Sequence, residues 1–69
     1  MEPYQECVIE ERVELGKKVV SLVTYIMSND IFLFLPEVEQ MLLRRQLYLM
    51  SEYHEVLTKR IQIFEKETT

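Results

Sequence analysis

The chain has 69 residues, of which 48% are hydrophobic and 29% charged, and its formal net charge is −4 at pH 7. A chain of this length makes one domain, expected over residues 1–69, and its folded monomer would hide only about 60% of the surface that the unfolded chain exposes. The acidic balance argues against binding to duplex nucleic acid, which relies on extended positive surface.

The first predicted element is a helix from about Pro3 to Met27. Proline suits the first helical position, because the N–H that it lacks would have no partner there. Two neighbouring apolar rows follow, and together they make a face broader than one partner helix can cover. One row contains Val8, Arg12, Leu15, Val19, Leu22 and Ile26, and the other contains Ile9, Val13, Gly16, Val20, Val23 and Met27.

The segment Ser28-Asn29-Asp30 is the stop signal between the two long apolar segments, because short polar side chains compete for backbone hydrogen bonds. Asp30 is expected to cap a short helical turn through residues 31–34. Pro36 then opens a second long helix at its first position. This helix is expected to run to about Glu65, with residues 66–69 frayed.

The second helix also carries two rows. One contains Leu42, Gln46, Leu49, Tyr53, Val56, Arg60 and Ile63, and the other contains Leu43, Leu47, Met50, His54, Leu57, Ile61 and Phe64. A short connection makes consecutive helices antiparallel, so positions whose numbers sum to about 65 become neighbours and Tyr4 falls beside Arg60 and Ile61. The expected fold is therefore all-α: an antiparallel helical hairpin with a short connecting helical turn. Because its faces are too broad for one partner, it is expected to assemble into a helical homo-oligomer.

Enzyme signatures are missing from the sequence. The only glycine, Gly16, lies in mid-helix, so there is no glycine loop for phosphates. The sole histidine, His54, follows Glu52 by two positions, whereas helical metal sites use a spacing of three. Cys7 has neither a second cysteine nor an evident histidine partner. We therefore expect neither catalysis, nor a metal, nor a cofactor, and His54 is expected to be a packed or interface side chain.

The expected environment is the cytoplasm. No segment approaches the roughly 18 apolar residues that span a bilayer, and no basic leader with an apolar core is present. A lone Cys7 allows no intramolecular disulfide and suits a reducing compartment. Self-association remains as the means of stabilising so small a chain.

Arg60 is the most informative cation, because it occupies an apolar row. A buried guanidinium requires an anionic or carbonyl partner. That partner is either a glutamate from a neighbouring helix or a phosphate, which the planar fork of arginine binds bidentately. Other basic residues are expected at the solvated surface unless a ligand meets them; they include Lys17, Lys18, Arg44 and Arg45.

The sequence resembles the phage anti-CBASS cyclic-oligonucleotide sponges and the related small helical proteins of crAss-like phages. The resemblance covers nearly the whole chain and rests on the order and spacing of many short pieces rather than on one motif. These pieces are Pro3-Tyr4-Gln5-Glu6, the acidic run to Leu15 and Lys18, Phe34-Leu35-Pro36-Glu37, Gln40, Leu42-Leu43, Gln46-Leu47, Met50, Tyr53, Leu57, Arg60-Ile61 and Phe64.

The resemblance implies a homohexamer that sequesters cyclic di- and trinucleotide immune messengers, without cleaving them, in the cytoplasm of the infected bacterial host. By this resemblance Tyr4 stacks on the bases of cyclic dinucleotides and Lys18 holds their phosphates, with Lys17 as the rival lysine. Arg60, gathered from several protomers, would hold cyclic trinucleotides.

Spacing adds a constraint to this expectation. Tyr4 and Lys18 are 14 positions apart, or about 21 Å along a helix, so a site that uses both must be shared between copies. An antiparallel contact between two first helices, centred near Arg12, would bring them together. Two other interpretations remain open: an acidic inhibitor that binds a host enzyme, and a purely structural oligomerisation module in which Arg60 pairs with a glutamate.

Overall fold

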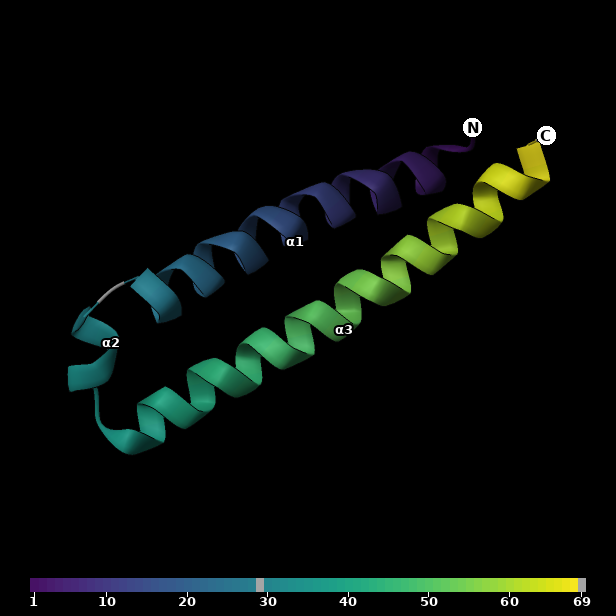
Figure 1. Ribbon diagram of the computed structural model, residues 1–69. Coiled ribbons are helices and arrows are strands. Elements are labelled where there is room, and N and C mark those ends of the chain that lie inside the picture. The colour runs from purple at the N-terminus through teal and green to yellow at the C-terminus, as the bar shows by residue number, and fades with distance from the viewer. Residues whose placement is uncertain (29, 69) are drawn as a thin grey trace.

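The computed structural model describes residues 1–28 and 30–68. Three helices follow one another: α1 (Pro3–Ser28), α2 (Asp30–Phe34) and α3 (Glu37–Thr68). α1 and α3 lie side by side and antiparallel, α2 closes the turn, and both termini lie at the opposite, open end (Figure 1). The described residues contain no strand, which confirms the all-α class. Asn29 of the expected stop signal lies outside the described residues.

α1 begins at Pro3, as predicted, and its start is capped by Glu2 and Gln5. The Glu2 carbonyl accepts hydrogen bonds from the backbone N–H groups of Gln5 at 3.0 Å and Glu6 at 3.2 Å. In return, the backbone N of Glu2 donates to the side-chain oxygen of Gln5 at 2.9 Å. A side chain at the third helical position that reaches back to the cap satisfies a donor that would otherwise lack a partner. Gln5 is buried in this arrangement.

The closed end of the hairpin is built around Phe32 of α2, which is fully buried. The Tyr25 ring of α1 meets it edge-on, with centroids 6.2 Å apart. From α3, the Arg44 guanidinium lies over the same ring at 5.4 Å. Phe32 therefore joins all three helices, and edge-on ring pairs and cations over rings are both favourable arrangements.

The two ends of α3 differ from the predicted ones. Pro36 is the residue before the helix rather than its first residue: its carbonyl accepts the N–H of Gln40 at 3.1 Å, as a capping residue does. The Gln40 side chain also donates to the carbonyls of Leu33 at 3.2 Å and Leu35 at 2.9 Å. At the other end the prediction of fraying was wrong for residues 66–68, because α3 continues to Thr68. Lys66 lies in the last turn, where its positive charge interacts favourably with the negative end of the helix dipole.

The core lies between α1 and α3 toward the open end. It contains Val8 and Leu15 from α1, and Leu57, Ile61 and Phe64 from α3, all buried. The row of α3 that runs through Leu57 is therefore the one that packs against α1. The register differs from the predicted one by about a turn, since Tyr4 meets Phe64 and these numbers sum to 68.

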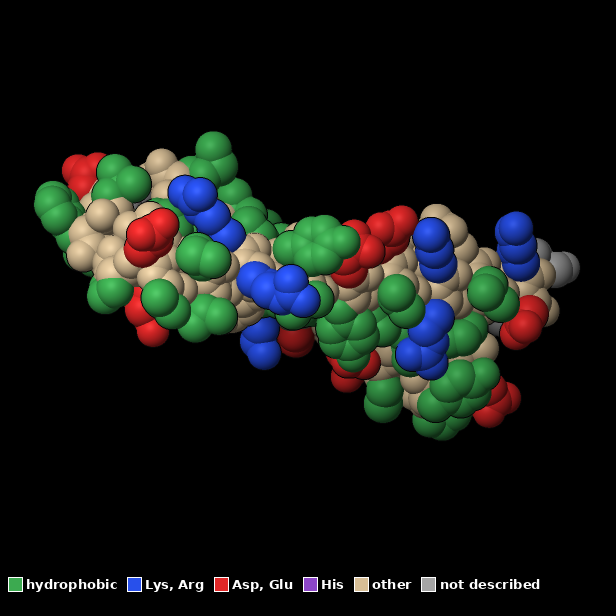
Figure 2. All heavy atoms as spheres, turned by 90° about the horizontal axis from the view of Figure 1, so that it is seen from below, with side chains coloured by type: hydrophobic (Ala, Val, Ile, Leu, Met, Phe, Trp, Pro, Cys, Tyr) green, Lys and Arg blue, Asp and Glu red, His purple; other side chains and the backbone are tan. Residues whose placement is uncertain are grey.

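The other row of α3 faces outward. We call it the outer row of α3, and its members are Leu42, Gln46, Leu49, Tyr53, Val56, Arg60 and Ile63. Leu42 is 57% exposed and Ile63 is 55% exposed, at opposite ends of the row. The side of the molecule seen from α3 accordingly shows hydrophobic side chains along its length, among Lys and Arg (Figure 2).

The hairpin is too thin to cover its own apolar residues. It measures 50 × 15 × 15 Å, with a radius of gyration of 15.5 Å, against about 11 Å for a compact chain of this length. Its accessible surface is 5486 Å², against about 4600 Å² for a compact protein of this mass. The extra surface, about 900 Å², is the consequence of two helices forming a single layer.

Candidate ligand-binding site

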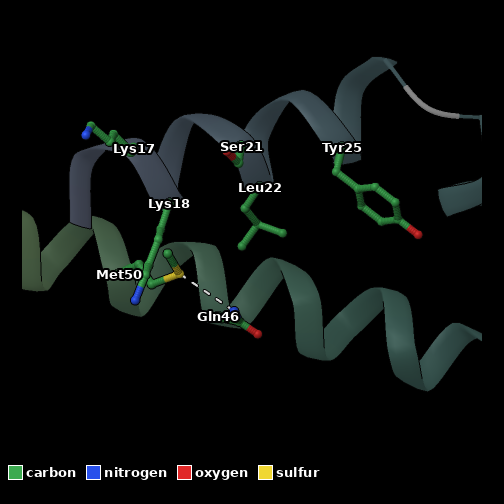
Figure 3. Close-up of a pocket in the computed structure, with 7 residues that line it drawn as sticks. All are labelled: Lys17, Lys18, Ser21, Leu22, Tyr25, Gln46 and Met50. Atoms are coloured by element: carbon green, nitrogen blue, oxygen red, sulfur yellow. Dashed lines mark hydrogen bonds between the residues drawn. The ribbon is translucent and has the colours of Figure 1, made fainter. Parts of the chain in front are cut away.

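The two rival lysines of α1 point in different directions. The Lys17 ammonium lies 3.2 Å from the Glu14 carboxylate, one turn earlier on α1, and its side chain points away from α3 (Figure 3). Lys18 points across the gap toward α3, with its ammonium beside Met50 (Figure 3). Of the two, Lys18 is the one whose charge is directed into the groove between the helices.

This groove has a volume of about 400 Å³. It is lined by Lys17, Lys18, Ser21, Leu22 and Tyr25 from α1, and by Gln46 and Met50 from α3. The Gln46 amide nitrogen lies 3.7 Å from the Met50 sulfur. Because a thioether is a weak acceptor, the stronger hydrogen-bonding capacity of this amide remains for other partners.

Three groove residues with a hydroxyl or an amide were not identified as binding candidates from the sequence: Ser21, Tyr25 and Gln46. Ser21 and Tyr25 could have been predicted from their spacing, because positions three and seven after Lys18 lie on the same side of a helix. Gln46 comes from the other helix, so only the register between α1 and α3 places it here. An ammonium, a hydroxyl, an amide and a ring are groups that bind phosphates and stack on bases.

The open end of the hairpin brings the other two candidates together. Tyr4 and Phe64 pack edge-on, with ring centroids 5.8 Å apart and planes at 83°. The Arg60 guanidinium lies 6.0 Å from the centroid of the same Phe64 ring. Tyr4 remains 57% exposed. Phe64 thus supports an accessible ring from one helix and an accessible guanidinium from the other.

The expectation of a buried Arg60 is not met within the protomer, where its side chain is exposed. The reason is the choice of row, since α3 turns the row of Leu57 inward and leaves the outer row to the surface. Arg12 is instead the arginine set into the inward side, half-buried between the buried positions Val8 and Leu15. Its Nε atom is buried and has no hydrogen-bond partner among the described residues.

Tyr4, Glu11 and Lys18 lie on one face of α1, because they follow one another at intervals of seven residues. Glu11 connects this face to the outer row of α3: its carboxylate accepts a hydrogen bond from the hydroxyl of Tyr53. Arg60 follows Tyr53 by seven residues on that row. The candidate ligand residues of both helices therefore belong to the same face of the hairpin.

One protomer does not bring all the candidates into one site. Tyr4 and Lys18 are about 21 Å apart along α1, with Tyr4 at the open end and Lys18 in the groove. Tyr4 and Arg60 share Phe64, whereas Lys18 shares its groove with Tyr25 and Gln46.

The opposite face carries a second, smaller groove of about 280 Å³. It is lined by Gly16, Val19, Val20, Ser51 and His54. A β-carbon added at Gly16 would lie 3.4 Å from Nε2 of His54. Gly16 therefore marks a close approach of the helices, and the half-buried His54 packs against it.

Within residues 1–28 and 30–68, no three His, Cys, Asp or Glu side chains form a group that could hold a metal ion.

The chain belongs to the Sequestin family, whose model matches residues 2–63. Comparison with curated proteins gave no match, and neither did comparison with solved structures. No helix of the described residues is long and apolar enough to cross a bilayer.

Proposed function

We propose that this member of the Sequestin family is a phage anti-defence sponge. It binds cyclic di- and trinucleotide second messengers of CBASS immunity in the cytoplasm of the infected host and sequesters them without cleavage. The family's name supports sequestration of a ligand. The observation that carries the proposal is the single face that presents an accessible aromatic ring, Tyr4, together with Lys18 and Arg60.

Cyclic dinucleotides are bound between two protomers. When two α1 helices lie antiparallel with their midpoints near Glu11, Tyr4 of one copy lies beside Lys18 of the other. The exposed Tyr4 ring can stack on a base, and stacking contributes about 1–3 kcal/mol per base. Lys18 supplies the charge for the phosphates. The direction of the Lys18 side chain favours it over Lys17, whose ammonium is paired with Glu14.

Cyclic trinucleotides are bound by Arg60 from several protomers. Its guanidinium is held over the Phe64 ring, while its side chain is exposed at the open end. A guanidinium in this position keeps its N–H donors for phosphate oxygens, which it can grip two at a time. A cyclic trinucleotide has three phosphates and can then bind the Arg60 guanidinium groups of three protomers.

Assembly into a homo-oligomer, proposed to be a hexamer, follows from the distribution of apolar surface. The outer row of α3 lies on the ligand-binding face, as the bond between Tyr53 and Glu11 indicates. The second apolar row of α1 is exposed on the opposite face, at Val13 and Val20. Two separate apolar surfaces require two different neighbours, which a simple dimer does not supply.

Isothermal titration of the purified protein with cyclic di- and trinucleotides tests the proposal. We expect heat of binding at micromolar concentrations, and recovery of the intact nucleotide when the complex is denatured. Recovery of linear products would instead indicate an enzyme. No heat with any of these nucleotides would reject the sponge; a nucleotide-free protein that captures one host enzyme in defined stoichiometry would then favour the acidic inhibitor.

A further inference from the structure

The outer row of α3 has a pattern that is complementary to itself. Its two polar members are Gln46 and Arg60, which stand seven positions before and seven positions after Tyr53. Apart from Tyr53, which is 44% exposed, the row between and beyond them carries only apolar side chains, each half-exposed or more. These are Leu42 (57%), Leu49 (50%), Val56 (53%) and Ile63 (55%).

We propose that the outer row of α3 packs antiparallel against the outer row of a second copy, around a two-fold axis beside Tyr53, with Gln46 of each copy bonded to Arg60 of the other. This interface needs no nucleotide, so it goes beyond the proposed function and is tested separately from it.

The register follows from the positions of the side chains. In an antiparallel pair centred on Tyr53, residues whose numbers sum to about 106 stand at the same height. Gln46 then faces Arg60, while Leu42 faces Ile63 and Leu49 faces Val56, each within one residue, or about 1.5 Å. Polar residues meet polar residues and apolar residues meet apolar residues along the whole row. An isologous interface requires this self-complementarity.

The pairing explains why two polar side chains interrupt an apolar row. The carbonyl oxygen of the Gln46 amide can accept an N–H of the guanidinium, which has five donors and keeps the others for a phosphate. Within one protomer the two residues are 14 positions apart, or about 21 Å along α3, so they cannot reach each other. Only a second copy can supply the partner.

The hairpin as a whole has surface to give to a partner. The hairpin exposes about 900 Å² more than a compact protein of its mass, and a standard interface buries about 800 Å² from each partner. α1 takes part as well: Glu11 is the midpoint between Tyr4 and Lys18, and it is bonded to Tyr53. One axis near this bond therefore serves both helices to within about a turn, and two hairpins make a four-helix bundle.

Charge substitution tests the inference on the full chain without nucleotide. Gln46→Arg would place an introduced cation opposite Arg60 of the other copy, and sedimentation velocity should show the association between copies weakened at least tenfold. Adding Arg60→Glu to the same chain restores an attractive pair and should recover most of the loss. Because the two positions are too far apart within one chain, this recovery can arise only between copies. Gln62→Arg, an exposed substitution off the outer row, is the matched control.

A second measurement locates the axis. In a Cys7→Ser background, Tyr53→Cys places a thiol beside the same thiol of the second copy. A disulfide forms when two β-carbons come within about 4.5 Å. We expect this variant to form covalent dimers at least tenfold faster than Glu55→Cys, which lies off the outer row. Equal rates for the two thiols, an equal effect of Gln62→Arg, or a double variant no stronger than Gln46→Arg would each overturn the proposed interface.

Discussion

The hydroxyl of Tyr53 on α3 donates a hydrogen bond to the carboxylate of Glu11 on α1, across 42 positions of sequence. This contact joins the outer row of α3 to the face of α1 that carries Tyr4 and Lys18. Both residues are accessible at the surface, Tyr53 with 44% of its side chain. The bond therefore joins the two helices on the exposed side of the core, beside Leu15 and Leu57.

Tyr53→Phe should destabilise the protein slightly, by about 0.5–1.5 kcal/mol, because it removes one net hydrogen bond and keeps the ring. Urea unfolding monitored by circular dichroism, at fixed protein concentration, measures the change. Tyr48→Phe is the control, since that ring is also exposed on α3 and should have no effect on the unfolding midpoint. Equal midpoints for all three proteins would show that the bond does not contribute in solution.

Gly16→Ala should stabilise the protein by about 0.5–1 kcal/mol, because alanine favours a helix interior over glycine by that amount. The added β-carbon would lie 3.4 Å from His54, which is at the close end of ordinary contact. Gly16→Leu should instead destabilise, since its longer side chain meets the imidazole. The melting temperature is the readout, and 1 kcal/mol shifts it by about 4–8 °C in a chain of this size. A melting temperature lowered by alanine would mean that the helices approach still more closely.

Lys18→Ala should weaken cyclic dinucleotide binding by about 10- to 150-fold, the loss expected for a hydrogen bond to a charged group. Lys17→Ala, its neighbour, should leave the affinity within about twofold, since its ammonium is paired with Glu14 and its side chain points away from α3. Titration calorimetry at two salt concentrations measures both, and the effect of Lys18 should shrink at high salt. The opposite order of the two variants would assign the phosphate to Lys17.

Tyr4→Ala should weaken cyclic dinucleotide binding by about 5- to 150-fold, because one stacked base is lost. Tyr4→Phe should retain most of the affinity, since it keeps the ring. Tyr48→Ala removes an exposed ring of α3 and serves as the control. A Tyr4→Phe variant as weak as Tyr4→Ala would indicate that the hydroxyl, rather than the ring, binds the ligand.

Arg60→Ala should leave the oligomer assembled and abolish cyclic trinucleotide binding, while cyclic dinucleotide binding persists. Assembly survives because the apolar side chains of the outer row still pack, although Gln46 of the other copy loses its proposed bond to Arg60. Native mass spectrometry measures the particle, and titration measures each ligand; Lys59→Ala, in an exposed pair with Glu55, is the control. Loss of assembly with Arg60→Ala would instead mean that this arginine is chiefly structural and that apolar packing of the row alone does not hold the oligomer.

The sequence predicted the helices well, because their boundaries depend on local chemistry. A proline at the start of α1, the polar segment near residue 28 and the carboxylates after Pro36 act within one turn of where they stand. The end of α3 was less predictable, since the polar residues after Glu65 are compatible with both a frayed and a helical last turn.

The amphipathic pattern also predicted that each long helix has two apolar rows, and that a hairpin alone could not cover both. Which row faces inward was not predicted from the sequence, although the row of Leu57 has one polar member, His54, and the outer row has two, Gln46 and Arg60. That choice depends on how α2 directs α3 back along α1, and on the pairing of Leu57 and Phe64 with Val8 and Leu15. Local propensity does not contain these long-range contacts.

The environment of the arginines followed from that choice. The sequence singled out Arg60 because of its apolar row, and the tertiary structure places this row at the surface and Arg12 on the inward side instead. The groove around Lys18 likewise required Gln46 and Met50 from α3, which are distant in sequence. The sequence itself determined where the long helices form and how broad their apolar faces are, because helical hydrogen bonds and side-chain periodicity are local. The tertiary structure decided which of those faces closes the hairpin and which is left for a partner, because that choice rests on packing contacts between residues that are distant in sequence.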